Sequence, residues 1–127
     1  MTVQENLVSA NTEIRDRRRA TIALSNNPLP ELDYVVTLAG RVWNIATGNE
    51  AVLSIRYIPD VLIIERSSLG DYLSVISEND WASLEDVTAA ILDDFNNELV
   101  PRWIHIGVTG PEEKNGGRHS VIVEDRQ

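Results

Sequence analysis

Apolar and polar side chains alternate over two neighbouring stretches of the chain, residues 32–43 and residues 51–58. Because a period of two places every second side chain on one face, this pattern is typical of strands buried on one side only. Thr47-Gly48-Asn49 separates the two stretches, and Pro59-Asp60 ends the second. We therefore predict a hairpin of two long strands, followed by a short apolar run at residues 61–64.

The middle of the chain changes to helical spacing. A short helix is predicted after Ser67 or Ser68, either of which can cap it, because apolar residues follow at i, i+3, i+4 and i+7: Leu69, Tyr72, Leu73 and Ile76. A longer helix is predicted from an apolar stripe that comprises Leu84, Val87, Ile91, Phe95 and Leu99. Pro101 prevents this second helix from continuing.

Alternation returns at the end of the chain, over residues 102–109 and 119–124, with Gly110-Pro111 and Gly116-Gly117 marking the turn between them. The predicted order is strand, strand, helix, helix, strand, strand. Such an α+β unit is a four-stranded antiparallel sheet with two helices on one face. It resembles the subunit of the tunnelling fold (T-fold), in which several copies would pair their exposed sheet edges to close an oligomeric barrel.

Residues 1–30 are polar and show no clear period. They contain Arg15, Arg17, Arg18 and Arg19 and end in the breaker-rich stretch Ser25-Asn26-Asn27-Pro28-Leu29-Pro30. We predict an irregular N-terminal arm with scope for flexibility, followed by a single T-fold domain over residues 31–127. The arginine run has two interpretations: contact with an anionic partner, or a solvated or subunit-crossing arm that pairs with neighbouring acidic groups, which is favoured.

Charge and composition exclude several functions. Twenty acidic against eleven basic residues give a formal net charge of -9, which repels phosphate backbones, so no nucleic-acid partner is expected. The absence of cysteine removes disulfides, thiolate nucleophiles and thiolate metal ligands. No apolar run has the length of a signal-peptide core or of a bilayer span, so we expect a cytoplasmic protein without membrane contact.

Five short segments occur in a distinctive order and spacing. They are Thr47-Gly48, Tyr57-Ile58-Pro59-Asp60, Glu65-Arg66-Ser67-Ser68-Leu69-Gly70-Asp71-Tyr72-Leu73, Pro101-Arg102-Trp103-Ile104 and Gly116-Gly117. Together they cover about residues 33–124 and resemble the 7-cyano-7-deazaguanine reductase (QueF)-like family of T-fold proteins. The resemblance implies a place in 7-deazapurine and queuosine metabolism, and hence in tRNA modification.

The resemblance also implies an active site with a nucleophilic cysteine ahead of the Thr-Gly, an aspartate soon after it, and a His-Glu pair at the start of the longer helix. Asn44 occupies the cysteine position and Leu84 the histidine position. The family's covalent thioimide with a nitrile therefore cannot form. Any altered reaction would use Glu50, in place of the aspartate, or Glu65 as a base, with Asn44 orienting a water or amine.

The glutamate of the pair is kept as Glu85. A guanine-like or pterin-like ring presents an N–H beside an exocyclic amine, and one carboxylate can accept both hydrogens. The resemblance therefore implies that Glu85 binds the ring and that Glu65 is a second contact. The residues alone permit simpler interpretations, in which Glu85 is a first-turn acid beside a Ser83 and Asp86 capping box and Glu65 is a solvated strand end.

Cofactor and metal sites have less support. The family's NADPH contacts would fall on the segment where Arg66 is accompanied by an added acid, Asp71, and near Lys114 and Arg118. These residues argue against NADPH, and the cofactor is left unknown. A metal held by the two histidines, His105 and His119, would need further ligands, so no metal site is expected.

Two main hypotheses from different classes remain, beside a less favoured one in which the Arg-rich arm brings a tRNA or other nucleic-acid partner to the oligomer. In the first, a homo-oligomer binds a 7-deazaguanine, guanine or pterin-like ring between subunits and performs chemistry other than cysteine-dependent nitrile reduction. In the second, a T-fold oligomer binds a ligand, or acts as a scaffold, without catalysis. The sequence leaves open whether the chain is an enzyme.

Overall fold

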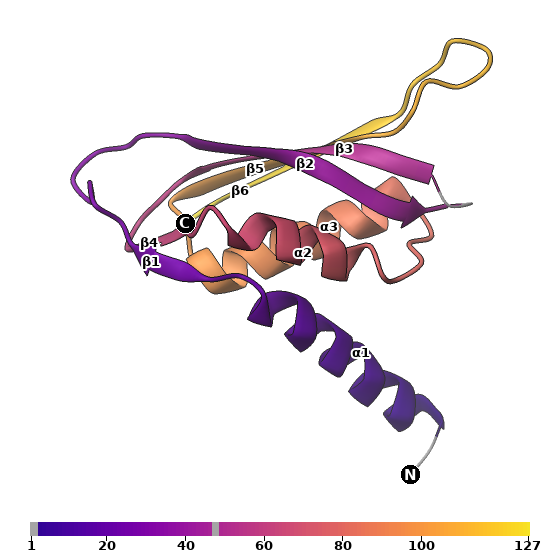
Figure 1. Ribbon diagram of the computed structural model, residues 1–127, viewed down its shortest axis with the longest axis horizontal. Helices are drawn as coiled ribbons and strands as arrows, with labels where there is room; N and C mark the ends of the chain where they lie inside the picture. Colours follow the sequence, from indigo (N-terminus) through magenta and orange to yellow (C-terminus); the bar gives the residue numbers. More distant parts are fainter. Residues whose placement is uncertain (1–2, 47–48) are drawn as a thin grey trace.

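The computed structural model describes residues 3–46 and 49–127. In chain order the helices and strands are α1 (Val3–Ala20), β1 (Leu24–Asn26), β2 (Val36–Ile45), β3 (Asn49–Ile58), β4 (Leu62–Ile64), α2 (Ser68–Ile76), α3 (Leu84–Leu99), β5 (Trp103–Thr109) and β6 (Ser120–Arg126). An antiparallel sheet has the order β2-β3-β5-β6, and a smaller one pairs β1 with β4. Helices α2 and α3 cover one face of the larger sheet (Figure 1), which confirms the predicted α+β unit.

The core lies between α3 and the middle of the sheet. Val87, Ile91 and Phe95 of α3 are fully buried, as are Ile55 of β3 and Ile106 of β5. Both elements therefore bury the apolar face that their periodicity predicts. The limits predicted for the longer helix are confirmed.

The two helices begin differently. Ser83 caps α3, and its hydroxyl accepts a hydrogen bond from the backbone N–H of Asp86 at 3.1 Å. Ser67 occupies the cap position of α2, but its side chain makes no capping hydrogen bond. The predicted cap is therefore confirmed for α3, whereas α2 depends on the packing of its apolar face.

The first long strand begins later than its alternation suggests, at Val36 instead of Leu32. Arg102 holds the preceding segment in a loop, because its guanidinium donates to the carbonyl of Pro30 at 2.6 Å and to the carboxylate of Asp33 at 2.8 Å. These bonds come from the residue just before β5. The strand limit thus depends on a contact that is distant in sequence.

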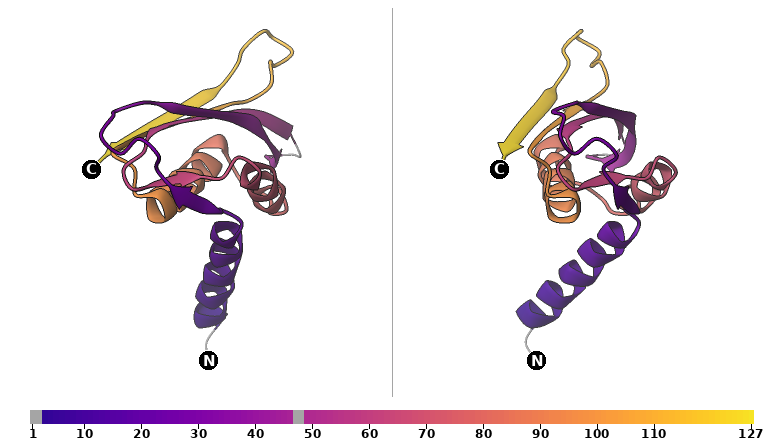
Figure 2. Two further views of the ribbon diagram at one scale, coloured as in Figure 1. Left: turned by 60° about the vertical axis from the view of Figure 1, so that its left-hand side comes forward. Right: turned by 90° about the vertical axis from the view of Figure 1, so that its left-hand side faces the viewer.

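The N-terminal prediction of an irregular segment is wrong. Residues Val3–Ala20 form α1, which extends away from the body of the molecule (Figures 1 and 2), and Leu24–Asn26 forms β1. Periodicity did not indicate this helix, because the segment is polar in composition and lacks a broad apolar stripe. The last turn of α1 contacts the body through Arg18 and Arg19, while the domain boundary at residue 30 stays a prediction.

One buried carboxylate joins the three helices. Asp94 of α3 has no exposed surface, and it accepts hydrogen bonds from Arg18 at 2.8 and 3.2 Å, from Arg19 at 2.9 Å and from the Tyr72 hydroxyl at 2.6 Å. Burial and the charge of Asp94 raise the pKa of Tyr72 well above its ordinary value, so the hydroxyl keeps its proton. The arginines pair with an acidic group, as favoured from the sequence, although that group belongs to their own chain.

We predict that Asp94→Asn lowers the free energy of unfolding by about 3–5 kcal/mol, because the buried Arg18 would lose its counter-charge. Tyr72→Phe should cost less, about 1–3 kcal/mol, since it leaves the ion pair in place. Urea denaturation followed by circular dichroism measures both changes. Asp93→Asn, the same substitution at an exposed position of α3, is the matched control and should stay within about 0.5 kcal/mol. Equal losses at positions 93 and 94 would contradict the role of Asp94.

Candidate functional site

One end of the sheet brings together several chain segments. β2 ends there, β3 begins, β5 ends and β6 begins, because each strand runs antiparallel to its neighbour. The start of α3 lies at the same end: a Cβ placed on Gly110 would be 3.5 Å from Cδ1 of Leu84. These segments form a cavity of about 280 Å³, here called the end-of-sheet pocket, whose lining includes Ile45, Ala46, Glu50, Leu84, Pro111 and His119.

A β-bulge interrupts the pairing of β2 and β3 beside this pocket. Trp43 and Asn44 together face Glu50 alone, and Asn44 has a φ of 63°. Asparagine is among the few side chains that tolerate this left-handed backbone. The Asn44 side-chain nitrogen donates to the backbone carbonyl of Ser77 at 2.6 Å, and the backbone carbonyl of Asn44 accepts from the N–H of Trp81 at 2.9 Å. Asn44 therefore ties the end of β2 to the loop between α2 and α3.

Of the two proposed catalytic residues, only Glu50 is among the residues that line the end-of-sheet pocket. Its carboxylate lies 3.2 Å from the guanidinium of Arg41, and both side chains are substantially exposed. Since an exposed ion pair of this kind holds its partners weakly, the carboxylate can also contact a ligand. The Thr47-Gly48 motif that follows Asn44 lies outside the described residues.

Glu85 occupies the first turn of α3, next to the pocket. Its Oε1 lies 3.3 Å from Nε2 of His119, which lines the pocket, while Glu85 itself does not. The capping bond of α3 runs from Ser83 to the backbone of Asp86 and does not use the Glu85 carboxylate. Glu85 is thus at the rim of the pocket, with a carboxylate that the helix cap leaves available.

Strand β4 lies at the opposite end of the sheet (Figure 1), and Glu65 follows it directly. The hydroxyl of Tyr57 accepts a hydrogen bond from the N–H of Ile64, which fixes this segment beside the far end of β3. Tyr57 is seven residues beyond Glu50 along β3, a separation of about 23 Å at the usual rise of a strand. A single chain therefore does not bring Glu65 to the pocket that Glu50 lines.

The two histidines are also apart. His105 pairs with Glu124 within the β5–β6 ladder, whereas the carbonyl of His119 accepts from the N–H of Gly110 at its end. Across residues 3–46 and 49–127, no group of three or more histidine, aspartate and glutamate side chains could hold a metal ion. The sequence analysis weighed His119 as a metal ligand against a surface or cavity-lining side chain, and it did not foresee the contact with Glu85.

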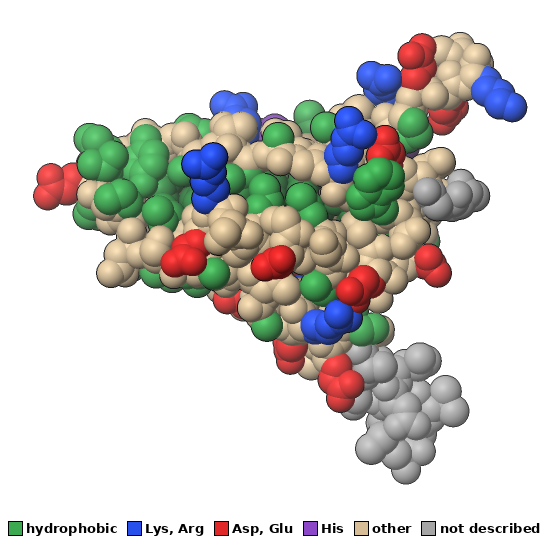
Figure 3. Space-filling view, in the orientation of Figure 1, with side chains coloured by type: hydrophobic (Ala, Val, Ile, Leu, Met, Phe, Trp, Pro, Cys, Tyr) green, Lys and Arg blue, Asp and Glu red, His purple; other side chains and the backbone are tan. Residues whose placement is uncertain are grey.

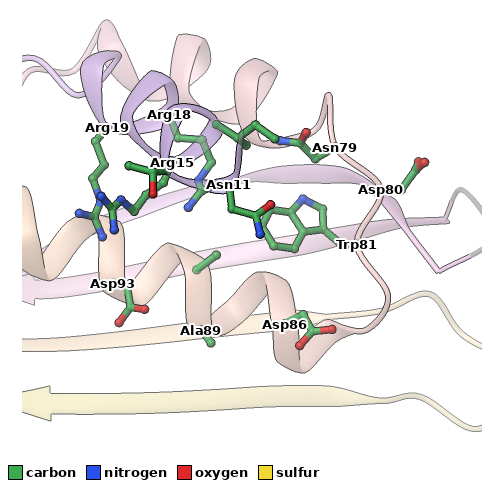
Figure 4. A pocket seen from close by; sticks show the side chains of 13 residues that line it. Asn11, Arg15, Arg18, Arg19, Asn79, Asp80, Trp81, Asp86, Ala89 and Asp93 are labelled. Atoms are coloured by element: carbon green, nitrogen blue, oxygen red, sulfur yellow. The ribbon is translucent and has the colours of Figure 1, made fainter. Parts of the chain in front are cut away.

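A larger groove, of about 700 Å³, lies between α1, α3 and residues 79–81 (Figure 4). Arg15, Arg18 and Arg19 point from α1 towards α3 in this groove (Figure 4). Arg18 and Arg19 already pair with Asp94. The four predicted site residues are absent from the described lining of the groove: Asn44, Glu50, Glu65 and Glu85. Their chemistry belongs to the ends of the sheet instead.

The model of a protein family described as QueF-like protein matches residues 50–126. The NADPH-dependent 7-cyano-7-deazaguanine reductase of Thermomicrobium roseum is 36% identical over 101 residues, which cover 76% of this chain and 77% of the reductase. The chain belongs to the QueF-like family. The reductase of the same name from Aquifex aeolicus is 31% identical over 101 residues, which cover 76% of each chain. That from Syntrophus aciditrophicus is 38% identical over 85 residues, which cover 63% of this chain and 60% of the reductase.

Solved structures confirm the T-fold. An archaeosine synthase QueF-Like in its apo form superposes with a TM-score of 0.62 at 15% identity, covering 71% of this chain and 91% of the other. A putative dihydroneopterin aldolase from Vibrio cholerae gives 0.58 at 15% identity, covering 76% and 99%. The Escherichia coli dihydroneopterin aldolase in complex with neopterin gives 0.57 at 14% identity, covering 72% and 98%. At these identities the likeness concerns the fold alone.

Proposed function

We propose that this QueF-like protein binds a 7-deazaguanine, guanine or pterin-like ring in the end-of-sheet pocket, with Glu85 as the principal contact. The position of Glu85 carries the proposal: it lies in the first turn of α3, at the rim of a pocket that Glu50 and His119 line. The QueF-like family is linked to 7-deazaguanine metabolism, since the reductases that resemble this chain are named for 7-cyano-7-deazaguanine. One structure of the same fold contains neopterin.

The chemistry of Glu85 suits such rings. Guanine and pterin share an edge on which a ring N–H lies next to an exocyclic amine, and the two oxygens of one carboxylate can accept both hydrogens. The pocket volume of about 280 Å³ is close to the lower limit of about 300 Å³ for small-molecule sites. A pocket of that size suits a single bicyclic ring.

The chemistry proposed for this protein differs from cysteine-dependent nitrile reduction. The sequence contains no cysteine, and the amide nitrogen of Asn44 donates to the carbonyl of Ser77. A thioimide intermediate is therefore not part of the proposal. A reaction at this site would use Glu50 as the base, because its carboxylate lines the pocket, with Asn44 orienting a water or amine through its oxygen.

A non-catalytic protein that binds a ring, or a structural T-fold oligomer, is the second candidate. The bond between Asn44 and Ser77 favours it, because this side chain has a structural use that requires no substrate. Both candidates share the fold and the oligomer. They differ in whether Glu50 and Asn44 act on a bound ring.

The proposal includes no NADPH and no nucleic acid. Arg66 is accompanied by an acid, Asp71, in the same segment, and the guanidinium of Arg118 already lies 3.9 Å from the carboxylate of Glu112. Arg18 and Arg19 are occupied by Asp94. No helix among the described residues is long and apolar enough to span a membrane, and a cytoplasmic location stays a prediction.

Assembly into a homo-oligomer is part of the proposal. In the described sheet β2 and β6 each pair on one side only, which leaves two edges open to other copies. Four large apolar side chains are exposed in the segments that follow β1 and precede β4: Leu29, Leu32, Val35 and Val61. Figure 3 shows that exposed apolar side chains gather over one end of the molecule. A neighbouring copy is also the only source from which Glu65 could reach a ligand held by Glu85.

We predict that Glu85→Gln weakens the binding of guanine at least about tenfold, because the amide replaces one acceptor by a donor facing the ring's own N–H groups. Equilibrium dialysis measures the dissociation constant. Asp86→Asn is the control, since it removes the next acid of the same helical turn, and it should change binding by less than about twofold. Equal affinity of the wild type and the Glu85 variant would refute Glu85 as the ring contact.

We predict that ring binding needs two copies of the chain. Glu65→Ala and Glu85→Ala should each bind guanine weakly as pure proteins, whereas unfolding and refolding a mixture should restore part of the binding, because some sites then receive both native residues. Sedimentation equilibrium of the wild type should show an oligomer. A monomer, or no recovery in the mixture, would refute the shared site.

We predict that Glu50→Gln lowers turnover about 100-fold or more if the ring is a substrate, as expected for loss of a general base. The substrate to use is the ring recovered from the purified protein by mass spectrometry. Asn44→Gly is the appropriate second variant, because glycine accepts the φ of 63° while removing the amide. Unchanged turnover in both variants would refute their catalytic roles, and absence of turnover in the wild type would support the non-catalytic candidate.

A further inference from the structure

His119 has no role in the function proposed above, yet it is the side chain that connects Glu85 with the end-of-sheet pocket. It lines the pocket, and its Nε2 lies 3.3 Å from Oε1 of Glu85. Its backbone is held in place, because its carbonyl accepts from the N–H of Gly110 at 2.9 Å immediately before β6 begins. The backbone that bears the imidazole is therefore fixed by a hydrogen bond.

The contact between His119 and Glu85 is poorly explained as a stabilising interaction. The two side chains are 59% and 60% exposed, and exposed ion pairs contribute little to folding. The geometry has a clearer chemical meaning: it places one nitrogen donor directly beside the two oxygen acceptors of a carboxylate. The site thus presents one donor and two acceptors in a row.

This row of one donor and two acceptors complements one edge of the ring. Guanine presents the carbonyl oxygen O6, the N1–H and the exocyclic amine in a row, which is acceptor, donor, donor; a pterin presents the same three groups. If Glu85 accepts the last two, Oε1, the oxygen nearer His119, takes the N1–H, because N1 is next to the carbonyl. The imidazole N–H then lies on the side where the carbonyl oxygen must be.

We propose that His119 is a specificity-determining residue, whose Nε2–H donates to the carbonyl oxygen beside the N–H that Glu85 binds. The inference rests on the proposed function, since it requires a ring at Glu85. It adds that the site selects 6-oxo purines and 4-oxo pterins over rings whose carbonyl oxygen is replaced. A site able to hydrogen-bond such a group discriminates against analogues that lack it.

Three rings test this assignment by equilibrium dialysis against the full-length protein: guanine, 6-thioguanine and hypoxanthine. Thioguanine replaces only the carbonyl oxygen by sulfur, a poor acceptor, and hypoxanthine lacks only the amine. The wild type should bind guanine about tenfold more tightly than thioguanine, the value of one ordinary hydrogen bond. His119→Ala should reduce that preference to about twofold or less, while its preference for guanine over hypoxanthine, which depends on Glu85, should persist.

Arg118→Ala is the matched control, because it shortens the adjacent side chain, which does not line the end-of-sheet pocket. It should retain the wild-type preference. If the wild type binds guanine and His119→Ala keeps the full preference over thioguanine, the role of His119 is refuted while the proposed function stands. If the wild type binds none of the three rings, the proposed function and the role of His119 fall together.

Discussion

The fold depends on the carboxylate of Asp94, which lies in the core without exposed surface. Removing such a charge from water costs several kcal/mol, so the buried carboxylate is tolerated only because donors from two other helices surround it. Arg18 and Arg19 of α1 and Tyr72 of α2 supply them, so this carboxylate is one of the points that fix α1 to the body. Arg18 also lies over the ring of Trp81, 5.7 Å from its centre.

The influence of this ion pair extends towards the candidate site through Trp81. The backbone of Trp81 donates to the carbonyl of Asn44 and accepts from the N–H of Ala46, so it pairs with β2 at the bulge. Its indole nitrogen donates to the carbonyl of Ile76 at the end of α2. The charge cluster, the loop between the helices and the end of β2 are therefore one connected structure. The end-of-sheet pocket, which Ala46 lines, borders that structure.

Much of the fold was predictable because sheet and helices each bury one face, which periodicity records. The bounds of α3 followed from it, and those of the four long strands followed to within one or two residues. The start of β2 is the exception, because Arg102 holds Asp33 in a loop. Helix α1 was not predictable in this way. Its last turn is held by ion pairs with Glu78 and Asp94, and such pairs leave no periodic trace in the sequence. Strands β1 and β4 are only three residues long and give no usable alternation.

The candidate site was predictable in part. Glu50 and Glu85 lie at the same end of the sheet because antiparallel pairing and the path of α3 bring their segments there. Glu65 lies at the other end of the sheet. The family resemblance drew attention to Asn44, Glu50, Glu65 and Glu85 and gave no indication of His119. Its position just before the last strand, opposite Gly110, was the available clue, because that end of the final hairpin adjoins the start of α3.

The bulge at Asn44 limits which side chains can occupy this position. A cysteine introduced at this position would adopt a left-handed backbone, at a cost of about 1–2 kcal/mol, and would leave the Ser77 carbonyl without its donor. The thiol would thus enter a strand end shaped around an amide. The local backbone therefore favours asparagine at position 44, and a cysteine there would need a change in the loop between α2 and α3 that gives the Ser77 carbonyl another donor.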